Sequence, residues 1–448
     1  MKTNPGLTWK PLIPCLFHLS WPAMLAMLFQ SINGVTDIFF LRVIGTDAQA
    51  AIGIFAVLEM YLTFFNSIIG NGSIGIISQC FGKGDVESAG YATAQTLFLK
   101  LFGSLLLTIP CLFFLRPLLL MIGAEGQALE MAIVYGKVMC FVIPLQNTGF
   151  SFNTALRAAG DALTPMYLMI GKVFVNVVLN CILVVGVGPF SSIGIVGVAI
   201  AAGVSQVFLC ISGMYVYLSK KTILSFQWKD FLHPDKQFIY KIIKIGMPKG
   251  YQQILMSIAN SIIIKRIAIF GMTSVAIFTV VSRITHFIMM PISGLSFATS
   301  TLVGQNIGAG RKDRAIKATN YSSIAGLLFT CCFFILVLVF PQYVLKIFSK
   351  DPVVVSMAVF PLLLFSFNQI LVSQSSIFNA PLLGTGYLKA SFYMNFISLW
   401  IVQIPLVHFL PLYYGLNGIW LSFTISMAID FCMVLHVFRK QKWMQRIV

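Results

Sequence analysis

The chain has 448 residues, of which 58% are hydrophobic and 10% are charged, and its formal net charge is +17. Its mean hydropathy of +0.90 is far above that of soluble globular proteins. This composition excludes a soluble enzyme or binding domain and indicates a polytopic membrane protein.

Apolar runs recur along the chain, and each is about 20 residues or longer, the length that crosses a bilayer as a helix. Short loops rich in Gly, Pro and charged residues separate them. We predict an all-α membrane protein with twelve transmembrane helices near residues 14–40, 49–78, 93–115, 128–155, 165–187, 193–218, 240–268, 275–303, 318–345, 353–380, 388–412 and 416–437. The first run is too long for a signal-peptide core, so we expect it to be retained.

The basic residues lie mostly in alternate loops, the distribution that orients a membrane protein. One side holds Lys2, Lys10, Lys83, Arg157, Lys220, Lys221, Lys229, Lys236, Lys241, Lys244, Arg311, Lys312, Arg314, Lys389, Arg439, Lys440 and Lys442, and the other holds Arg42, Arg116, Lys346 and Lys350. We therefore expect a multi-pass protein of the inner (cytoplasmic) cell membrane with both termini cytoplasmic. Because membrane orientation accounts for the positive charge, we expect no nucleic-acid partner.

The second half of the sequence repeats the first at an offset of 226 residues. Pro22 meets Pro248, and "QCFGKG" (79–84) meets "QNIGAG" (305–310). Many transporters are built from such internal repeats. An even number of helices in each half makes the two halves parallel and relates them by an axis along the membrane normal.

The repeat predicts three parts of the chain. Residues 1–217 form an N-terminal lobe of six helices, 218–237 form a basic cytoplasmic connector, and 238–448 form a C-terminal lobe of six helices. We expect the lobes to be related by pseudo-twofold symmetry, with the substrate between them.

An isolated acid, Asp37, lies in the first apolar run, and its counterpart in the repeat is Ile263. A charged side chain near the bilayer centre costs about 2.5–3.5 kcal/mol on insertion scales, and such residues usually mark an ion or substrate path. Loss of water favours the protonated form of a carboxylic acid, so Asp37 is a candidate proton-binding residue. The alternative is a hydrogen-bonding role in helix packing.

Two other features of the first run support a site at Asp37. Gln30, Asn33 and Asp37 follow one another at spacings of three and four residues, which places all three side chains on one helix face. Pro22, fifteen residues before Asp37, frees the carbonyl of His18 from helix hydrogen bonding. We predict a hinge at Pro22, and a static kink is the alternative.

Two more acids fall inside predicted spans. Glu59 lies about ten residues into the second helix and is either a second proton site or the partner of a basic group. Asp430 lies near the inner end of the last helix, where we expect it to pair with Arg439 or another basic group.

Several asparagines are further candidates. Asn176 and Asn180 lie one turn apart in the fifth predicted helix, and their amides can orient a carboxylate or coordinate a cation. Interhelical hydrogen bonding is the alternative. Asn153 recurs as Asn379 in the repeat, which favours a structural role for it.

Sequence motifs of enzymes and metal sites are missing. Neither the nine cysteines nor the five histidines have the spacing of a metal site. The run "GNGSIG" (70–75) matches a dinucleotide-binding motif formally, but it lies inside an apolar helix with no preceding strand. There is no phosphate-binding loop for ATP. We therefore expect no enzyme, no metal and no cofactor, and a transporter driven by an ion gradient.

These residues, taken in order, resemble the multidrug and toxic compound extrusion (MATE) family, and especially its DinF-like branch. The resemblance covers nearly the whole chain and rests on Pro22 and Asp37 in helix one and on "GTDAQAAIG", "SQCFGKGD", "LRAAGDALTPM" and "LVGQNIGAGRKDRA" further on. It implies twelve helices in two lobes that form a V, and export of amphipathic, often cationic drugs in exchange for H+ or Na+.

In the DinF-like branch, the helix-one aspartate is the coupling site, bordered by an asparagine and an aspartate on helix five and a threonine on helix six. Asp37 and Asn176 match this pattern, whereas Asn180 stands in place of the second aspartate and Ala202 in place of the threonine. Hard cations prefer carboxylate-rich cages, so these departures favour H+ over Na+. The acids that another branch uses on helices seven and ten are absent.

We therefore predict a secondary active multidrug efflux antiporter that exports cationic or amphipathic organic compounds in exchange for H+ by alternating access. The candidate coupling-ion residues are Asp37, Asn176, Asn180 and Glu59, and the candidate cavity or substrate residues are Gln30, Asn33, Met27, Asn153 and Met256. Na+-coupled drug export is one alternative. Another is a lipid or lipid-linked oligosaccharide flippase of the same superfamily, for which Lys100, Lys137 and Lys172 within predicted spans would bind phosphate. We expect a monomer.

Overall fold

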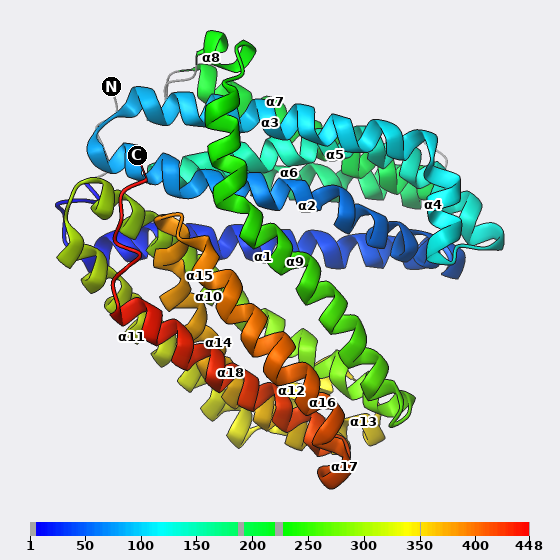
Figure 1. Ribbon diagram of the computed structural model, residues 1–448. Helices are drawn as coiled ribbons and strands as arrows, with labels where there is room; N and C mark the ends of the chain where they lie inside the picture. The colour runs from blue at the N-terminus through cyan, green and yellow to red at the C-terminus, as the bar shows by residue number, and fades with distance from the viewer. Residues whose placement is uncertain (1–5, 187–191, 220–226, 350, 448) are drawn as a thin grey trace. The chain divides into compact units, whose positions relative to one another are not determined.

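The computed structural model describes residues 6–186, 192–219, 227–349 and 351–447, and these form helices and no strands. Ten helical runs are long and apolar enough to cross a membrane: α1 (Leu12–Ile44), α2 (Thr46–Lys83), α3 (Val86–Phe113), α5 (Gly126–Ala159), α6 with η1 (Leu163–Val185), α7 (Ile195–Leu218), α10 (Met272–Gly308), α11 (Lys312–Val339), α15 to α17 (Leu388–Tyr414) and α18 (Leu416–Arg439). The more polar α9 (Lys236–Ala268) and α14 (Val359–Gly384) bring the described long helices to the predicted twelve (10 + 2). Figure 1 shows these helices in chain order.

Short elements connect or interrupt the long helices. They are α4 (Leu115–Ile122), α8 (Trp228–Leu232), α12 (Pro341–Phe348), α13 (Pro352–Met357) and, within the run from Leu388, α15 (Leu388–Phe396), η2 (Ile397–Gln403), α16 (Ile404–Phe409) and α17 (Pro411–Tyr414). The predicted helix 318–345 is wrong at its end, because α11 stops at Val339 and Pro341 begins the separate helix α12. The prediction for 165–187 ends outside the described residues.

Two π-helical turns are features that the sequence did not predict. η1 (Cys181–Val185) continues α6 directly after Asn180, and η2 (Ile397–Gln403) interrupts the helix that begins at Leu388. Such turns are rare and are found frequently at functional sites. The polar side chains beside both turns are therefore candidates for functional residues.

By internal contacts the chain divides into two units. The first contains Leu25–Gly246, and the second contains Leu7–Met24 and Met247–Val448. This division differs from the expected lobe boundaries in two places: Leu7–Met24 packs with the second unit, and the described part of the connector, with the first turns of α9, packs with the first unit. The change of unit inside α1 falls two residues after Pro22.

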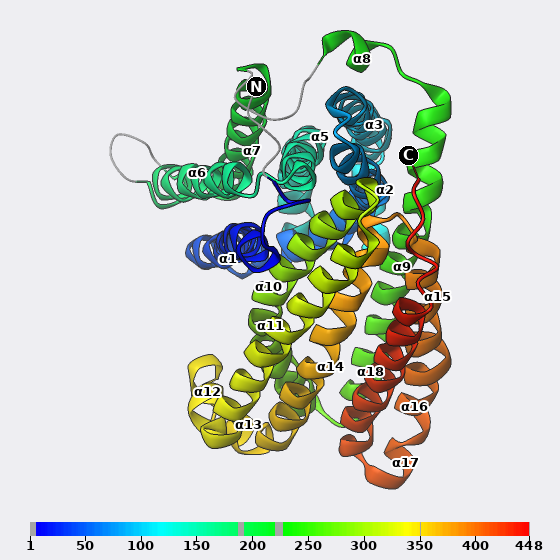
Figure 2. The ribbon, with the colours of Figure 1, turned by 90° about the vertical axis from the view of Figure 1, so that its left-hand side faces the viewer.

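In the first unit, α5 packs against α2, α3 and α7 (Figures 1 and 2). Its apolar core includes Phe55 of α2, whose ring packs edge-on against Tyr135 of α5 with centroids 5.3 Å apart. In the second unit, α14 packs against α10, α11 and α18, and Trp420 of α18 is buried against Phe278 and Phe365.

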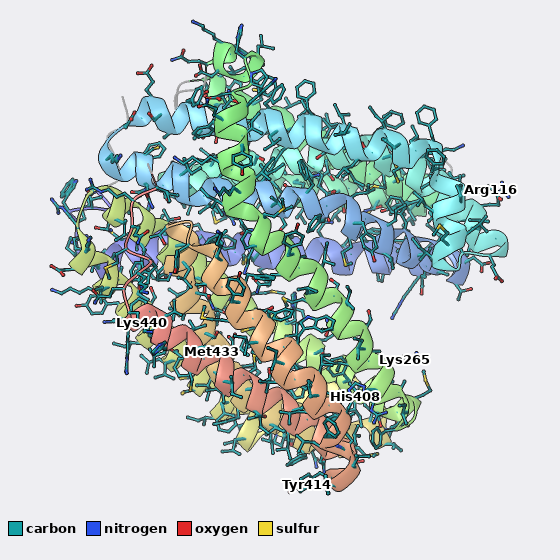
Figure 3. The ribbon with its side chains drawn as sticks, viewed as in Figure 1. Arg116, Lys265, His408, Tyr414, Met433 and Lys440 are labelled. Atoms are coloured by element: carbon teal, nitrogen blue, oxygen red, sulfur yellow. The ribbon has the colours of Figure 1, made fainter. Side chains whose placement is uncertain are left out.

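The two ends of the second unit can be followed in Figure 3. Lys265, His408 and Tyr414 lie at one end, whereas Lys440 lies at the other and Met433 lies between them on α18. At the first of these ends an Arg266 guanidinium NH donates to the carbonyl of His408 (3.4 Å). In the first unit, Arg116, also labelled, forms an exposed ion pair with Glu130 (3.2 Å), an arrangement that contributes little to stability.

Basic side chains hold the start of the chain in the second unit. Arg311 donates to the carbonyl of Thr8 (2.7 Å), and Arg314 donates to the carbonyls of Lys10 (2.7 Å) and Leu7 (3.3 Å). Leu7 is itself buried. These hydrogen bonds explain why residues expected in the N-terminal lobe pack with the second unit.

The buried amide of Gln95 makes several of the hydrogen bonds that fasten the connector to the first unit. Gln95 of α3 donates to the carbonyls of Asp230 (2.6 Å) and His233 (3.0 Å) and accepts from the backbone amide of Asp235 (3.0 Å). The pKa of the Asp235 carboxyl is lowered because the backbone amide of Phe238 and the hydroxyl of Tyr91 donate to it. The described part of the connector is thus a docked segment rather than a free link.

Replacing Gln95 with Leu removes all of these amide contacts, so we expect residues 228–235 to detach from α3. Limited trypsin digestion of the detergent-purified protein should then cleave at Lys229 and Lys236 faster than in the wild type. Thr96→Ala is the matched control, because the Thr96 hydroxyl donates within its own helix, to Ala92. Equal cleavage rates in the Leu variant and the control would contradict the docking.

Two glycines allow α2 and the start of α9 to approach backbone to backbone. A Cβ on Gly72 would collide with the carbonyl oxygen of Ile242, and a Cβ on Gly246 would collide with the carbonyl oxygen of Ile68. Small residues serve this purpose in many membrane helix pairs.

We expect Gly72→Val to separate α2 from α9 and to cost about 1–3 kcal/mol of stability, the range for overpacked cores. Gly53→Val is the control in the same helix, because nothing lies within 4 Å of a Cβ there. The measurement is thermal unfolding in detergent, followed by tryptophan fluorescence. Equal midpoints for the two variants would show that the close approach does not matter.

Candidate functional site

The Asp37 carboxylate lies in the last third of α1 and is held from two helices. The amide of Asn33, one turn earlier, donates to Oδ2 (3.0 Å), and the amide of Asn180 on α6 donates to Oδ1 (3.3 Å). Both oxygens of Asp37 are therefore engaged inside the first unit. Of the three residues predicted on one face of α1, Asp37 reaches Asn180 of α6 and Asn33 bonds to Asp37. Gln30, the third of them, is exposed.

The second amide hydrogen of Asn180 links it to its own helix. It reaches Oδ1 of Asn176, one turn earlier, at 3.1 Å, and both asparagines are almost fully buried. A side-chain amide carries two donor hydrogens, so the Asn180 Nδ2 group joins Asp37 and Asn176 at once. The π-helical turn η1 follows directly after Asn180.

Two carbonyl oxygens beside Asp37 have unused hydrogen-bonding capacity. Oδ1 of Asn33 and Oδ1 of Asn180 are buried, and neither has a hydrogen-bond partner within the described residues. Buried oxygens are seldom left in this condition in native proteins. They can accept from a protonated Asp37 or from water.

A second carboxylate and a lysine complete the site. Glu59 of α2 accepts from the amide of Gln146 on α5 (3.3 Å). Lys172 of α6 is 6% exposed and interacts electrostatically with both Asp37 and Glu59. Tyr135 of α5 is the other titratable group that interacts with the two acids. The site thus combines two carboxylates with one ammonium group.

Lys172 is the member of this site that the sequence interpretation missed, since it placed this lysine among possible phosphate ligands. A signal was present: Lys172, Asn176 and Asn180 follow one another at intervals of four, so their side chains share one face of α6. The other two lysines considered with it do not join it. Lys137 is exposed, and the Lys100 ammonium lies beside Gly70 of α2.

The remaining candidates lie elsewhere. Gln30 is exposed and Met27 is half-buried on α1, while Pro22 is buried within a helix that runs unbroken from Leu12 to Ile44. Asn153 is buried near the end of α5, and neither of its amide atoms has a hydrogen-bond partner within the described part of the chain. Met256 lies in the second unit, where it lines a cavity.

The sequence predicts that Asp430 pairs with Arg439 or another basic group, and within the described residues it forms no ion pair with Arg439. Its carboxylate accepts from the hydroxyls of Ser375 on α14 and Ser398 on η2, the latter at 3.3 Å. The basic group that interacts with it electrostatically is Lys249 of α9. In the described residues, no group of three or more His, Cys, Asp or Glu side chains could hold a metal ion.

A helical membrane protein made of two repeats, with opposite charges buried among the helices of one unit, has the organisation of a secondary transporter. Comparison with a protein-family model identifies which family of transporters this is. A model of the MatE family matches residues 22–182 and 248–409, so the chain belongs to the MATE family of multidrug efflux transporters. The two matches begin 226 residues apart (248 − 22), which is the offset of the internal repeat.

Relatives and solved structures agree with this assignment. The "Probable multidrug resistance protein YoeA" of Bacillus subtilis is 25% identical over 100% of this chain and 97% of its own length. The "Probable multidrug resistance protein NorM" of Thermotoga maritima is 27% identical over 97% of this chain and 93% of its own.

Among solved structures, a multidrug resistance MATE family transporter in an outward-facing conformation has a TM-score of 0.91 with this chain at 24% identity, covering 98% of both chains. A MATE structure in complex with MaL6 has a TM-score of 0.89 at 25% identity, also covering 98% of both chains. The predicted helical MATE fold is confirmed, and the matched relatives are transporters rather than enzymes.

Lys172 brings a positive charge to the region of Asp37 and Glu59, although within the described residues it forms no ion pair with either carboxylate. Replacing it with Met leaves Asp37, Glu59 and unpaired amide oxygens, the ligand types that hard cations prefer. We expect Lys172→Met to acquire a thermal midpoint that rises with Na+, by about 2.7 kcal/mol of stabilisation at 100 times the dissociation constant. The wild type should not respond when Na+ replaces choline.

Lys172→Arg is the control, because it keeps the positive charge and should stay insensitive to Na+. A Met variant whose midpoint ignores Na+ would show that the lysine does not stand in for a cation.

Proposed function

We propose that this chain is a secondary active antiporter that exports cationic or amphipathic organic compounds in exchange for H+, coupled through Asp37. The observation that carries the proposal is the Asp37 carboxylate itself, held from α1 and α6 beside Glu59 and Lys172. The chain belongs to a family of multidrug efflux transporters, and one relative is named "Multidrug export protein MepA" of Staphylococcus aureus.

Protonation of Asp37 changes the hydrogen bonds between α1 and α6. The ionised carboxylate only accepts, and the amides of Asn33 and Asn180 both donate to it. A protonated carboxyl carries a donor, which conflicts with one of these amides and suits an unused Oδ1 of the same two asparagines. Proton binding therefore favours a different arrangement of the two helices, as a two-state switch requires.

The formal charges of the site explain how one proton can replace one drug cation. With Asp37 and Glu59 ionised and Lys172 protonated, the site carries one net negative charge, which attracts a cation. A proton on Asp37 brings the net charge to zero and removes that attraction. Drug release then follows proton entry from outside, and loss of the proton to the cytoplasm resets the site.

We propose that Pro22 is the hinge of α1 during alternating access. The change between contact units occurs between Met24 and Leu25, two residues after this proline. We further propose an inner-membrane monomer with cytoplasmic termini, and membership of the DinF-like branch on the strength of Asp37 and Asn176.

Na+-coupled drug export is the competing form of this function. The ammonium of Lys172 argues against it, because a resident positive charge repels a second cation. A lipid flippase is not favoured, because the three lysines that suggested phosphate binding do not gather in one place.

Ethidium efflux from proteoliposomes, driven separately by an inward ΔpH and by an inward Na+ gradient, tests the proposal. We expect ΔpH alone to drive efflux by the wild type and Asp37→Asn to fall to the level of empty liposomes. Glu130→Gln is the control, because Glu130 is exposed and pairs with Arg116 in the same unit. Efflux driven by Na+ alone would overturn H+ coupling. An active Asp37→Asn variant would show that Asp37 is not the coupling residue and would make Glu59 the next candidate.

A further inference from the structure

The second unit contains a cavity of about 410 Å3 between α9, α10, α14, α15 and α18. This volume lies within the range of small-molecule sites. Apolar side chains such as Phe297, Leu388 and Met427 form part of its wall. The rest of the wall is polar, which is unusual for the interior of a membrane-protein unit.

Two opposite charges face this cavity. Lys249 follows Pro248 on α9, and Asp430 lies on α18 with its carboxylate held by Ser375 and Ser398. The two charges interact electrostatically across the site. The serine hydroxyls fix the position of the carboxylate, so the cavity presents an anchored anion and a lysine ammonium on a flexible stem.

Three further polar atoms of residues in the cavity wall form no hydrogen bond within the described structure. Oε1 of Gln252, Oγ of Ser296 and Oδ1 of Asn379 are buried, and none has a hydrogen-bond partner within the described residues. The two amide oxygens and the hydroxyl belong to residues of the wall, but neighbouring atoms cover them. Buried polar atoms in native proteins normally have partners, so the wall has spare hydrogen-bonding capacity.

We propose that this cavity binds a small zwitterion with an apolar side group, whose ammonium meets Asp430 and whose carboxylate meets Lys249. The apolar wall takes the side group, and rotation of the Gln252 or Asn379 side chain would let its amide oxygen accept from the ammonium. A single positive or negative molecule would leave one of the two protein charges unpaired, which is costly away from water.

The site belongs to the C-terminal half alone. The repeat pairs Lys249 with Ala23, and the matching N-cap glycines of α7 and α18, Gly194 and Gly415, pair Asp430 with Leu209. The inference is also independent of H+ coupling at Asp37, since it concerns binding to other residues. Its failure therefore leaves the proposed antiport untouched.

The test is equilibrium binding of radiolabelled phenylalanine to the purified full-length protein in detergent, with competition by three analogues. Phenylalaninamide lacks the carboxylate, N-acetylphenylalanine lacks the ammonium, and O-phosphoethanolamine carries the charges of a lipid headgroup without an apolar side group. We expect phenylalanine to bind at least about tenfold more tightly than each analogue.

Two variants test whether the preference for phenylalanine over its analogues depends on the charges of Lys249 and Asp430. Lys249→Gln should lose the preference for phenylalanine over phenylalaninamide, and Asp430→Asn should lose the preference over N-acetylphenylalanine. Because each readout is a ratio within one variant, a partly destabilised protein still gives an answer. Lys389→Gln and Asp313→Asn, which remove exposed charges of the same unit, should keep both ratios.

Absence of phenylalanine binding at millimolar concentration, or ratios that Lys249→Gln and Asp430→Asn leave unchanged, would overturn the proposal. Binding of O-phosphoethanolamine in preference to phenylalanine would contradict the proposal that the ligand has an apolar side group, and would indicate a lipid headgroup instead.

Discussion

Charged groups inside a bilayer have no water to hydrate them, and this constraint governs how the buried acids of the spanning helices are held. In the first unit, Asp37 and Glu59 accept hydrogen bonds from side-chain amides, and both interact electrostatically with Lys172. In the second unit, Asp430 receives two serine hydroxyls and shares the field of Lys249. The cost of burying these charges is reduced by polar partners within the same unit.

Much of the fold could be predicted because it follows from local composition. The apolar runs locate the helices, and the offset of 226 residues recurs in the two matches to the family model. Errors occur where a proline divides a run, as at Pro341, because apolar composition alone cannot show the break.

The candidate site was predictable only in part. Asp37, Asn33, Asn176 and Asn180 stand out as polar residues on apolar helices, and the structure brings them together. The partnership of Lys172 with two acids on other helices depends on tertiary packing, which one helix face cannot reveal. The serine partners of Asp430 are similar, because a serine in a membrane helix is too common to indicate a site.

The repeated scaffold carries different chemistry in its two halves. Asp37 corresponds to Ile263, whereas Lys172 corresponds to Ser398. This last position belongs to a polar region in both units, since the charge of Lys172 acts on Asp37 and Ser398 donates to Asp430. The helix position is therefore retained while the side chain and its charge have diverged.

The two polar sites consequently differ in formal charge. Two carboxylates and one ammonium give the first site one net negative charge, while Lys249 and Asp430 give the second site none. A site with net negative charge attracts a cation, and a site with separated opposite charges suits a molecule that carries both. The two halves of one repeat can thus accept different ligands, because electrostatic selection depends on the side chains and not on the shared fold.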